Sequence, residues 1–355
     1  MFETLGFETL GPREVSVFFG LAVGALFGAL AEATRFCLRR GLVGEATERR
    51  SALGVWLMAL AIAVAGTQGA VHAGWIGFGE HRFMAGDLPV LAIIAGGLIF
   101  GAGMVLTRGC ASRLTVLAGT GNLRALTVLA VFAIAAHATL KGVLAPLRTT
   151  LGSYTVAFGD TVSLDALPGG ALLWAALIAV AAFISALRSG NRPTILLGAA
   201  LIGALVPATW IGTGFVLYDE FDPIAFESLS FTSPAAETLF WTVASSSIPA
   251  GFGTGLIGGV IAGAAVLSFL AGRFRWQSFS SPRETGRYLA GAVLMGVGGV
   301  LAGGCTVGAG LAGIPTLSVA AILALLAIVA GARITDRALS ASPSGSAGSL
   351  ATPAE

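Results

Sequence analysis

Long apolar runs, separated by short polar and arginine-bearing stretches, repeat along the whole chain. An α-helix needs about 18 or more apolar residues to cross a bilayer, and only helices or closed barrels satisfy every backbone polar group in lipid. The pattern predicts an all-α polytopic membrane protein with about nine spanning helices and a partial or tilted helix at residues 235–250, before the seventh span. The nine spans are expected over residues 15–34, 53–72, 88–107, 123–146, 169–187, 193–216, 253–271, 286–304 and 314–332.

Composition agrees with this class of protein. The chain is 55% hydrophobic and 11% charged, whereas soluble domains carry about 25% charged residues. The first fourteen residues hold Glu3, Glu8 and Glu14 against Arg13, the wrong balance for a cleavable signal peptide. We therefore expect one transmembrane domain over residues 1–338, with two halves at about 15–168 and 169–333, and a disordered cytoplasmic tail over 339–355.

The basic residues predict an orientation. With the N-terminus outside, sixteen of the twenty Lys and Arg residues fall in inner loops, as the positive-inside rule requires. The four that fall outside are Arg13, Arg82, Lys141 and Arg148. The chain is thus expected to have a periplasmic N-terminus and a cytoplasmic C-terminus in a bacterial inner membrane.

Two segments of the chain are near-copies of each other. Gly96–Cys110 (GGLIFGAGMVLTRGC) and Gly291–Cys305 (GAVLMGVGGVLAGGC) align at an offset of 195 residues. The first ends the third span, which runs inward, and the second ends the eighth, which runs outward. The copies are therefore predicted to be antiparallel, an inverted-topology repeat of the kind found in transporters, whose substrate sites lie near the midplane. A short or re-entrant helix is expected after each copy, over Ala111–Gly119 and Thr306–Gly313.

The repeated cysteines are candidates for contact with a substrate. Unpaired N–H groups at a helix N-terminus favour anions, Gly109 and Gly304 allow close approach because they lack a Cβ, and a thiol is a soft, weak donor. A single buried cysteine is usually a packing residue, but its repetition in the same glycine context favours function. Cys37 lies beside arginines at the inner end of the first span, where a functional and an incidental role are equally open. Arg108, beside Gly109, either attracts an anion or anchors the inner interface.

Three other ionisable residues lie at membrane depth, where such residues are functional candidates. Glu32 precedes Arg35 by three residues, which favours an ion pair between them. His137 and Lys141 share one face of the fourth span, and Lys141 is expected to extend outward to the interface.

At these residues the chain resembles the YeeE/YedE family of bacterial inner-membrane sulfur-compound transporters. The resemblance extends from about Gly20 to Arg333 and is carried by RFCLRR around Cys37, RGCASRL with the downstream GTGNLRAL around Cys110, and GGCTVGAGLAG around Cys305. It implies an inverted two-fold fold, uptake of thiosulfate or a related sulfur anion, and a path lined by the three cysteines. The residues predicted to line this path are Cys37, Cys110, Cys305, Gly109, Gly304, Arg108, Ala111 and Thr306.

Thiosulfate chemistry suits such a path, since its hard oxygens fit backbone N–H groups and its terminal sulfur fits neutral thiols. Neither a cofactor, a metal nor an enzymatic reaction is expected, and a cytoplasmic sulfurtransferase is a possible partner that consumes the substrate. Two alternatives use the same cysteines: a soft-metal transporter, or a membrane enzyme that moves sulfane sulfur through a persulfide.

Overall fold

The computed structural model describes residues 10–159 and 161–341, and nearly all of its regular structure is helical. The α-helices are α1 (Pro12–Thr34), α2 (Leu38–Leu42), α3 (Ala46–His72), α4 (Val90–Leu106), α5 (Ala111–Gly119), α6 (Leu123–Lys141), α7 (Ala145–Gly152), α8 (Gly170–Leu187), α9 (Pro193–Ile211), α10 (Thr232–Ala244), α11 (Phe252–Leu270), α12 (Pro282–Leu301) and α13 (Val319–Ala341). Short 3-10 or π-helical turns are η2 (Arg82–Met84), η3 (Leu164–Ala166), η4 (Gly212–Val216), η5 (Thr306–Gly313) and η6 (Ile314–Thr316). A small antiparallel ribbon joins β1 (Asp87–Leu88) and β2 (Val156–Ala157).

Nine helical segments of the described chain are long and apolar enough to cross a membrane, which confirms the predicted number and the all-α polytopic class. Three of them are interrupted by a turn: Pro12–Leu42, Val90–Gly119 and Pro282–Thr316. Each interruption falls at one of the three cysteines, which are the N-cap residues of α2, α5 and η5. The short helices after Cys110 and Cys305 have the predicted bounds, whereas their re-entrant character stays a prediction. The partial helix expected at 235–250 is α10.

Glycines set the closest helix contacts in the bundle. A Cβ on Gly24 of α1 would lie 2.3 Å from the Leu256 carbonyl oxygen of α11, and one on Gly259 would lie 2.2 Å from that of Leu21. Without side chains at these positions the two helix backbones pack directly against each other. Such close packing is how helices associate in lipid, because moving an apolar side chain from lipid to protein gives no hydrophobic gain.

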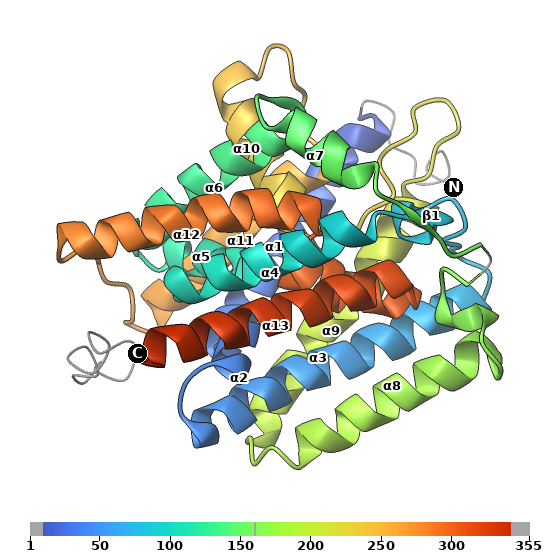
Figure 1. Cartoon of the computed structure of the whole chain (residues 1–355), viewed down its shortest axis with the longest axis horizontal. Helices are drawn as coiled ribbons and strands as arrows, with labels where there is room; N and C mark the ends of the chain where they lie inside the picture. Colours follow the sequence, from blue (N-terminus) through green and yellow to red (C-terminus); the bar gives the residue numbers. More distant parts are fainter. Residues whose placement is uncertain (1–9, 160, 342–355) are drawn as a thin grey trace.

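The two copies of the glycine-rich repeat pack against each other. A Cβ on Gly103 of α4 would lie 2.6 Å from the Gly291 carbonyl oxygen of α12, and one on Gly298 would lie 2.6 Å from that of Gly96. Gly291 and Gly298 are the residues aligned with Gly96 and Gly103, so the contact is reciprocal, as in a two-fold interface. α4, α12 and α13 lie side by side in the middle of Figure 1. The inverted relation of the whole halves stays a prediction.

The periphery of the bundle is apolar. α8 lies at one edge, beside α3, and is drawn at the bottom of Figure 1. Leu172, Leu177, Val180 and Leu187 of α8 are each more than half exposed, as a helix that faces lipid requires.

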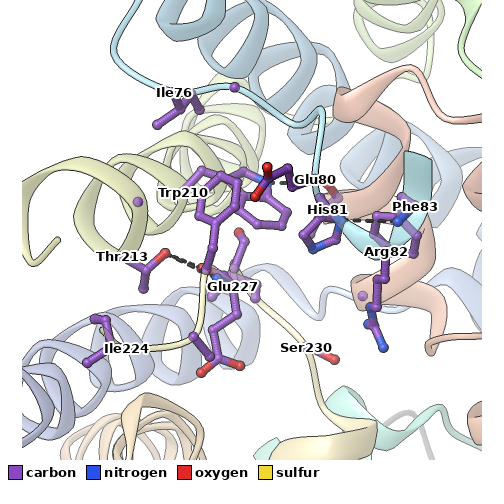
Figure 2. Close-up of a pocket in the computed structure, with 18 of the residues that line it drawn as sticks. Ile76, Glu80, His81, Arg82, Phe83, Trp210, Thr213, Ile224, Glu227 and Ser230 are labelled. Atoms are coloured by element: carbon purple, nitrogen blue, oxygen red, sulfur yellow. Dashed lines mark hydrogen bonds between the residues drawn. The ribbon is translucent and has the colours of Figure 1, made fainter. Parts of the chain in front are cut away.

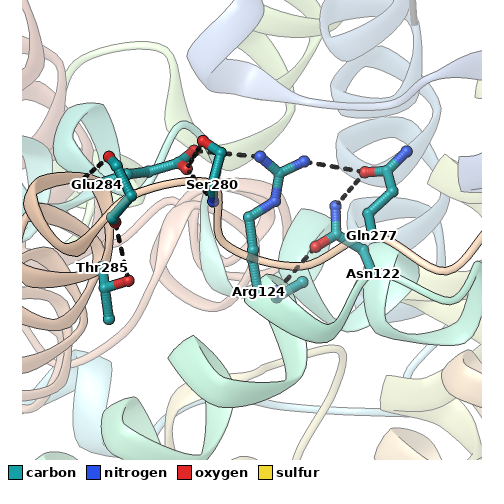
Figure 3. A network of polar contacts seen from close by, with 8 residues as sticks. Asn122, Arg124, Gln277, Ser280, Glu284 and Thr285 are labelled. Atoms are coloured by element: carbon teal, nitrogen blue, oxygen red, sulfur yellow. Dashed lines mark hydrogen bonds and ion pairs between the residues drawn. The ribbon is translucent and has the colours of Figure 1, made fainter.

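A polar network joins the two halves at the predicted inner side. Asn122 accepts a hydrogen bond from the Ala125 N–H and so caps α6, while its amide donates to Gln277 Oε1 at 2.9 Å. Arg124 donates to Gln277 Oε1 at 3.0 Å and pairs with Glu284 of α12 at 3.1 Å (Figure 3). The network ties the start of α6 to the segment that leads into α12.

The C-terminal boundary differs from the prediction. α13 continues through Ala341, past the expected end of the domain at residue 338. The Ser340 hydroxyl donates to the Asp336 carbonyl at 2.9 Å. Ala338, Leu339 and Ala341 have high helix propensity, so the helix continues to Ala341 despite the small polar residues nearby. Residues 342–355 of the predicted tail lie outside the described residues. α1 begins and α13 ends at opposite ends of the bundle, as an odd number of spans requires (Figure 1).

Candidate functional site

The two repeated cysteines come after turns of the same conformation. Arg108 and Gly303 both adopt the left-handed backbone region, with φ of 58° and 75°. The backbone hydrogen bonds that end the preceding helix and begin the next also match at the offset of 195. In the first half, the N–H groups of Thr107, Arg108 and Leu114 donate to the carbonyls of Gly103 (3.0 Å), Val105 (3.2 Å) and Cys110 (3.0 Å). In the second half, the N–H groups of Ala302, Gly303 and Ala309 donate in the same order to the carbonyls of Gly298 (2.9 Å), Val300 (3.2 Å) and Cys305 (2.9 Å). Each turn therefore places its cysteine at the N-cap of a short helix.

The glycine before each cysteine has its own neighbours. A Cβ on Gly304 would lie 2.8 Å from the Ala309 backbone nitrogen, a distance that real Cβ atoms do not show. A Cβ on Gly109 would meet only the side chains of Leu114, at 3.4 Å, and Arg113, at 3.7 Å. These neighbours lie within the turn itself, and they exclude a side chain strictly only at Gly304; the close approach of a ligand at both glycines stays a prediction.

The structure brings the three cysteines together. The Cys37 and Cys110 thiols interact with each other, and Cys110 also interacts with the hydroxyls of Thr306 and, at 3.2 Å, Ser112. Thr306 directly follows Cys305, which accepts a hydrogen bond from the Gly308 N–H at 3.4 Å. All three cysteines are free and are exposed by 2% or less. Residues more than 250 positions apart in the sequence thus form one buried row of soft side chains.

The other predicted path residues divide into buried and exposed ones. Ala111, Thr306, Gly109 and Gly304 are buried beside the cysteines. Arg108 is exposed, so its side chain lies away from this buried row, at the end of α4.

The ion pair expected between Glu32 and Arg35 is not formed. α1 ends at Thr34, and Arg35 takes the left-handed conformation with φ of 52°, which removes the helical spacing that the pair requires. Glu32 instead pairs with Arg113 at 3.5 Å and with Arg273 at 3.6 Å. Arg113 follows Cys110 by three residues, so the pair with Glu32 lies at the predicted inner end of the cysteine row.

His137 and Lys141 lie outside the cysteine row. The His137 ring stacks on Phe240 of α10, and Lys141 is exposed near the end of α6. Lys141 acts electrostatically on Glu237 of α10, which lines the outer cavity described below.

A cavity of about 1010 Å³ opens at the predicted outer side and reaches the second cysteine turn. Its wall includes Gly308, whose N–H donates to Cys305, and Ala312 of the same η5 segment. The rest of the wall comes from η2 and the loop before it, from α9 and η4, and from α10 and the segment before it. In Figure 2, Arg82, Glu227 and Ser230 extend toward the same part of this cavity. The cavity thus reaches from the predicted outer side to the backbone that holds Cys305.

Ionisable groups set the charge of this cavity. Burial and the neighbouring Glu237 carboxylate raise the pKa of Glu227 to about 8, although Arg82 acts in the opposite direction. Burial, together with Arg82, lowers the pKa of His81 to about 4, and His81 Nδ1 accepts from the Phe83 N–H at 3.3 Å. At neutral pH Glu227 is mostly protonated and His81 is neutral. Neither residue therefore neutralises or repels the positive charge of Arg82 with a full charge of its own.

Sequence reasoning missed the residues of this cavity. The sequence shows Glu227 only as part of an outer acidic group, and nothing in it distinguishes Ser230. Ser230 Oγ would lie 2.8 Å from a Cβ on Gly308, and the Phe231 backbone hydrogen-bonds the Cys305 thiol. The one usable signal is the acidic and serine-rich stretch before α10, which has no periodicity. Across residues 10–159 and 161–341 no group of three or more His, Cys, Asp or Glu side chains is placed to hold a metal ion.

Comparisons with known proteins agree on one class. A family model described as sulphur transport matches residues 33–334. A curated relative, the thiosulfate transporter TsuA of Escherichia coli (strain K12), is 27% identical over 317 residues, which cover 82% of this chain and 86% of the relative. The thiosulfate transporter TsuA of Spirochaeta thermophila is 28% identical over 357 residues, which cover 88% of this chain and 96% of the relative.

Proposed function

Because the chain belongs to the sulphur transport family, whose model spans residues 33–334, we propose that it takes up thiosulfate or a closely related sulfur anion across the bacterial inner membrane. The family match confirms the resemblance carried by the three cysteine motifs and makes the chain a multi-pass transporter rather than an enzyme. Thiosulfate enters the proposal because both curated relatives carry that substrate in their names.

The observation that carries the proposal is the buried row of Cys37, Cys110 and Cys305. It lies between the outer cavity, which reaches Gly308, and the inner arginines, which include Arg113. A path of this composition suits a substrate with one soft end, because neutral thiols donate weakly to sulfur and release it readily.

The hard end of the substrate has partners of its own. Each cysteine is the N-cap of a short helical segment, where backbone N–H groups lack intrahelical partners and attract oxygen anions. Thr306 and Ser112 add hydroxyl groups beside Cys110. In the proposed passage the anion moves from Cys305 past Cys110 to Cys37, with its oxygens on N–H and O–H donors and its terminal sulfur on a thiol.

Inward movement of a dianion is opposed by the membrane potential. The cost is about 4.6 kcal/mol per 100 mV for two charges, at about 2.3 kcal/mol for each. Rapid consumption of the anion by a cytoplasmic sulfurtransferase would offset this cost, and we propose such an enzyme as the functional partner. Uptake into vesicles that lack any cytosolic acceptor, at the full rate and to the full extent, would contradict this partner.

Growth on thiosulfate as sole sulfur source tests the proposal. The host lacks its own thiosulfate uptake and carries the wild type, Cys110→Ala or Cys305→Ala at matched membrane levels. We expect growth with the wild type and loss of growth with both variants. Failure of the well-expressed wild type would reject thiosulfate as the substrate, and growth with both variants would reject the thiol path.

A further inference from the structure

Two of the four basic residues predicted outside the membrane meet at one cavity. Arg82 of η2 and Arg148 of α7 both line a second cavity of about 210 Å³. The outer side carries few basic residues, in line with the positive-inside rule, and these two come from segments 66 positions apart in the sequence. Two positive charges at one cavity are favourable only where a negatively charged group binds there.

Neither arginine forms a direct ion pair with a carboxylate among the residues that the structure describes, although Glu227 acts on Arg82 at longer range. No carboxylate there lies within 4.0 Å of either guanidinium group, and Arg148 Nε is buried without a hydrogen-bond partner. Arg82 lies 5.2 Å from the centre of the Phe83 ring, which offers a cation–π contact but accepts no conventional hydrogen bond. A guanidinium group has five donors and cannot lose its charge, so a partly buried pair without acceptors is unfavourable until an anion binds.

The walls of the cavity suit a small oxyanion. They are otherwise mainly apolar, with Leu88, Pro89, Ile93 and Ala302 among them, and low local polarity strengthens charge-assisted hydrogen bonds. A volume of about 210 Å³ holds a tetrahedral oxyanion together with several waters, each of which occupies about 30 Å³ in the liquid.

The cavity also lies next to the proposed path. Gly303, which lines it, precedes Cys305 by two residues, and its left-handed turn leaves open space where a side chain would stand. Arg82 lines both this cavity and the larger outer one. An anion held here would have one ligand in common with the cavity that leads to Cys305.

We propose that Arg82 and Arg148 form a second oxyanion site, which holds a small dianion such as thiosulfate beside the path before it passes Arg82 into the outer cavity. The identity of the anion rests on the proposed function, whereas the existence of the site does not. The phosphate of a lipid has related chemistry. The free anion is favoured because the cavity adjoins the Gly303 turn and shares Arg82 with the outer cavity.

The test counts bound anions and measures transport on the same variants. Equilibrium dialysis of [35S]thiosulfate against the full chain in an uncharged detergent gives the number bound per chain, and uptake by cells gives KM and Vmax. We expect Arg148→Gln to bind one thiosulfate fewer than the wild type and to raise KM about tenfold at unchanged Vmax, the effect of losing one hydrogen bond from a charged group. Arg148→Lys should retain part of the binding, and Arg13→Gln, which removes another outer charge away from both cavities, should match the wild type.

Two results would overturn the site. Equal binding and equal KM for the wild type, Arg148→Gln and Arg13→Gln would show that the pair holds no anion. A phosphate-bearing lipid that native mass spectrometry finds on the wild type and not on Arg148→Gln, with no change in bound thiosulfate, would assign the cavity to lipid. If the wild type transports no thiosulfate but binds it in an Arg148-dependent manner, the proposed function fails and the site stands.

Discussion

In the first half of the chain, α4 ends at Leu106 and the backbone turns through Gly109 to Cys110; in the second half, α12 ends at Leu301 and turns through Gly304 to Cys305. The turns share a left-handed residue, the same hydrogen bonds and the same N-cap position. The segments after the two turns differ. Cys110 begins the regular helix α5, whereas Cys305 begins the π-helical η5, which is rich in glycine.

The surroundings of the two thiols differ in the same direction. The first turn lies among arginines, with exposed Arg108 before Cys110 and Arg113, paired with Glu32, after it. The second has only Gly303 at the matching position, and its η5 segment lines the outer cavity. The same backbone conformation therefore occurs in two environments. One is basic and lies at the predicted inner end of the proposed path, and the other has no arginine at the matching position and lines the cavity at the predicted outer end.

The largest expected effect comes from the two glycines before the cysteines. Gly304→Ala should lower thiosulfate uptake at least tenfold, because its Cβ would displace the backbone of η5, and overpacking costs about 1–3 kcal/mol. Gly109→Ala should stay within about threefold of the wild type, since its Cβ meets only the Leu114 and Arg113 side chains, which can adjust. Initial uptake rates at matched membrane levels measure both. Equal losses would show that the two turns tolerate a side chain alike.

The second effect concerns the outer environment alone. Below pH 8 Glu227 is mainly protonated, and above its pKa of about 8 it adds a negative charge to the cavity. Thiosulfate uptake should therefore fall above pH 8, by about fivefold for about 1 kcal/mol of repulsion. Glu227→Gln should abolish this fall. Glu237→Gln should move it to lower pH, because the Glu237 carboxylate raises the pKa of Glu227.

The other charges that face Glu227 define the control for this pH profile. Arg82 opposes the rise in its pKa, and His81 is neutral throughout the range because its pKa is about 4. Glu80→Gln removes a different carboxylate from the same cavity wall and should leave the fall above pH 8 in place. A fall that persists in Glu227→Gln would assign the titration to another group.

The range of the interactions decides which features could be predicted from the sequence. The nine spans and the short helices after Cys110 and Cys305 were predictable, because apolar length and a repeated motif are local properties. The Glu32 pair was predicted wrongly because a single left-handed residue, Arg35, ends the helix. The outer cavity could not be predicted because Glu227 lies in the irregular segment between η4 and α10. Only the tertiary fold brings this segment to the cavity.

The third prediction changes the residue with a left-handed backbone conformation in each turn, Gly303 and Arg108. Gly303→Ala should lower the unfolding midpoint by an amount equivalent to about 1–2 kcal/mol, since an L-residue is unfavourable at a φ of 75°. Arg108→Gly should raise the midpoint, because it relieves the same strain at a φ of 58°. Tryptophan fluorescence on heating in detergent measures both. Shifts of the unfolding midpoint in opposite directions for the two variants would support a shared backbone conformation, and shifts in the same direction would contradict it.

The smallest effect lies in the polar network that joins the halves (Figure 3). The Arg124 and Glu284 side chains are 20% and 16% exposed and lie 3.1 Å apart, and pairs that keep contact with water contribute about 0–1 kcal/mol. A double-mutant cycle of Arg124→Gln and Glu284→Gln should therefore give a coupling energy below about 1 kcal/mol that shrinks as salt is added. Asn122→Ala should cost about 1 kcal/mol, because it removes the side chain that caps α6. The Leu123 N–H also donates to the Gln277 carbonyl at 2.8 Å. A coupling above about 2 kcal/mol would mean that the ion pair, rather than the cap and this backbone hydrogen bond, holds the two halves together at this side.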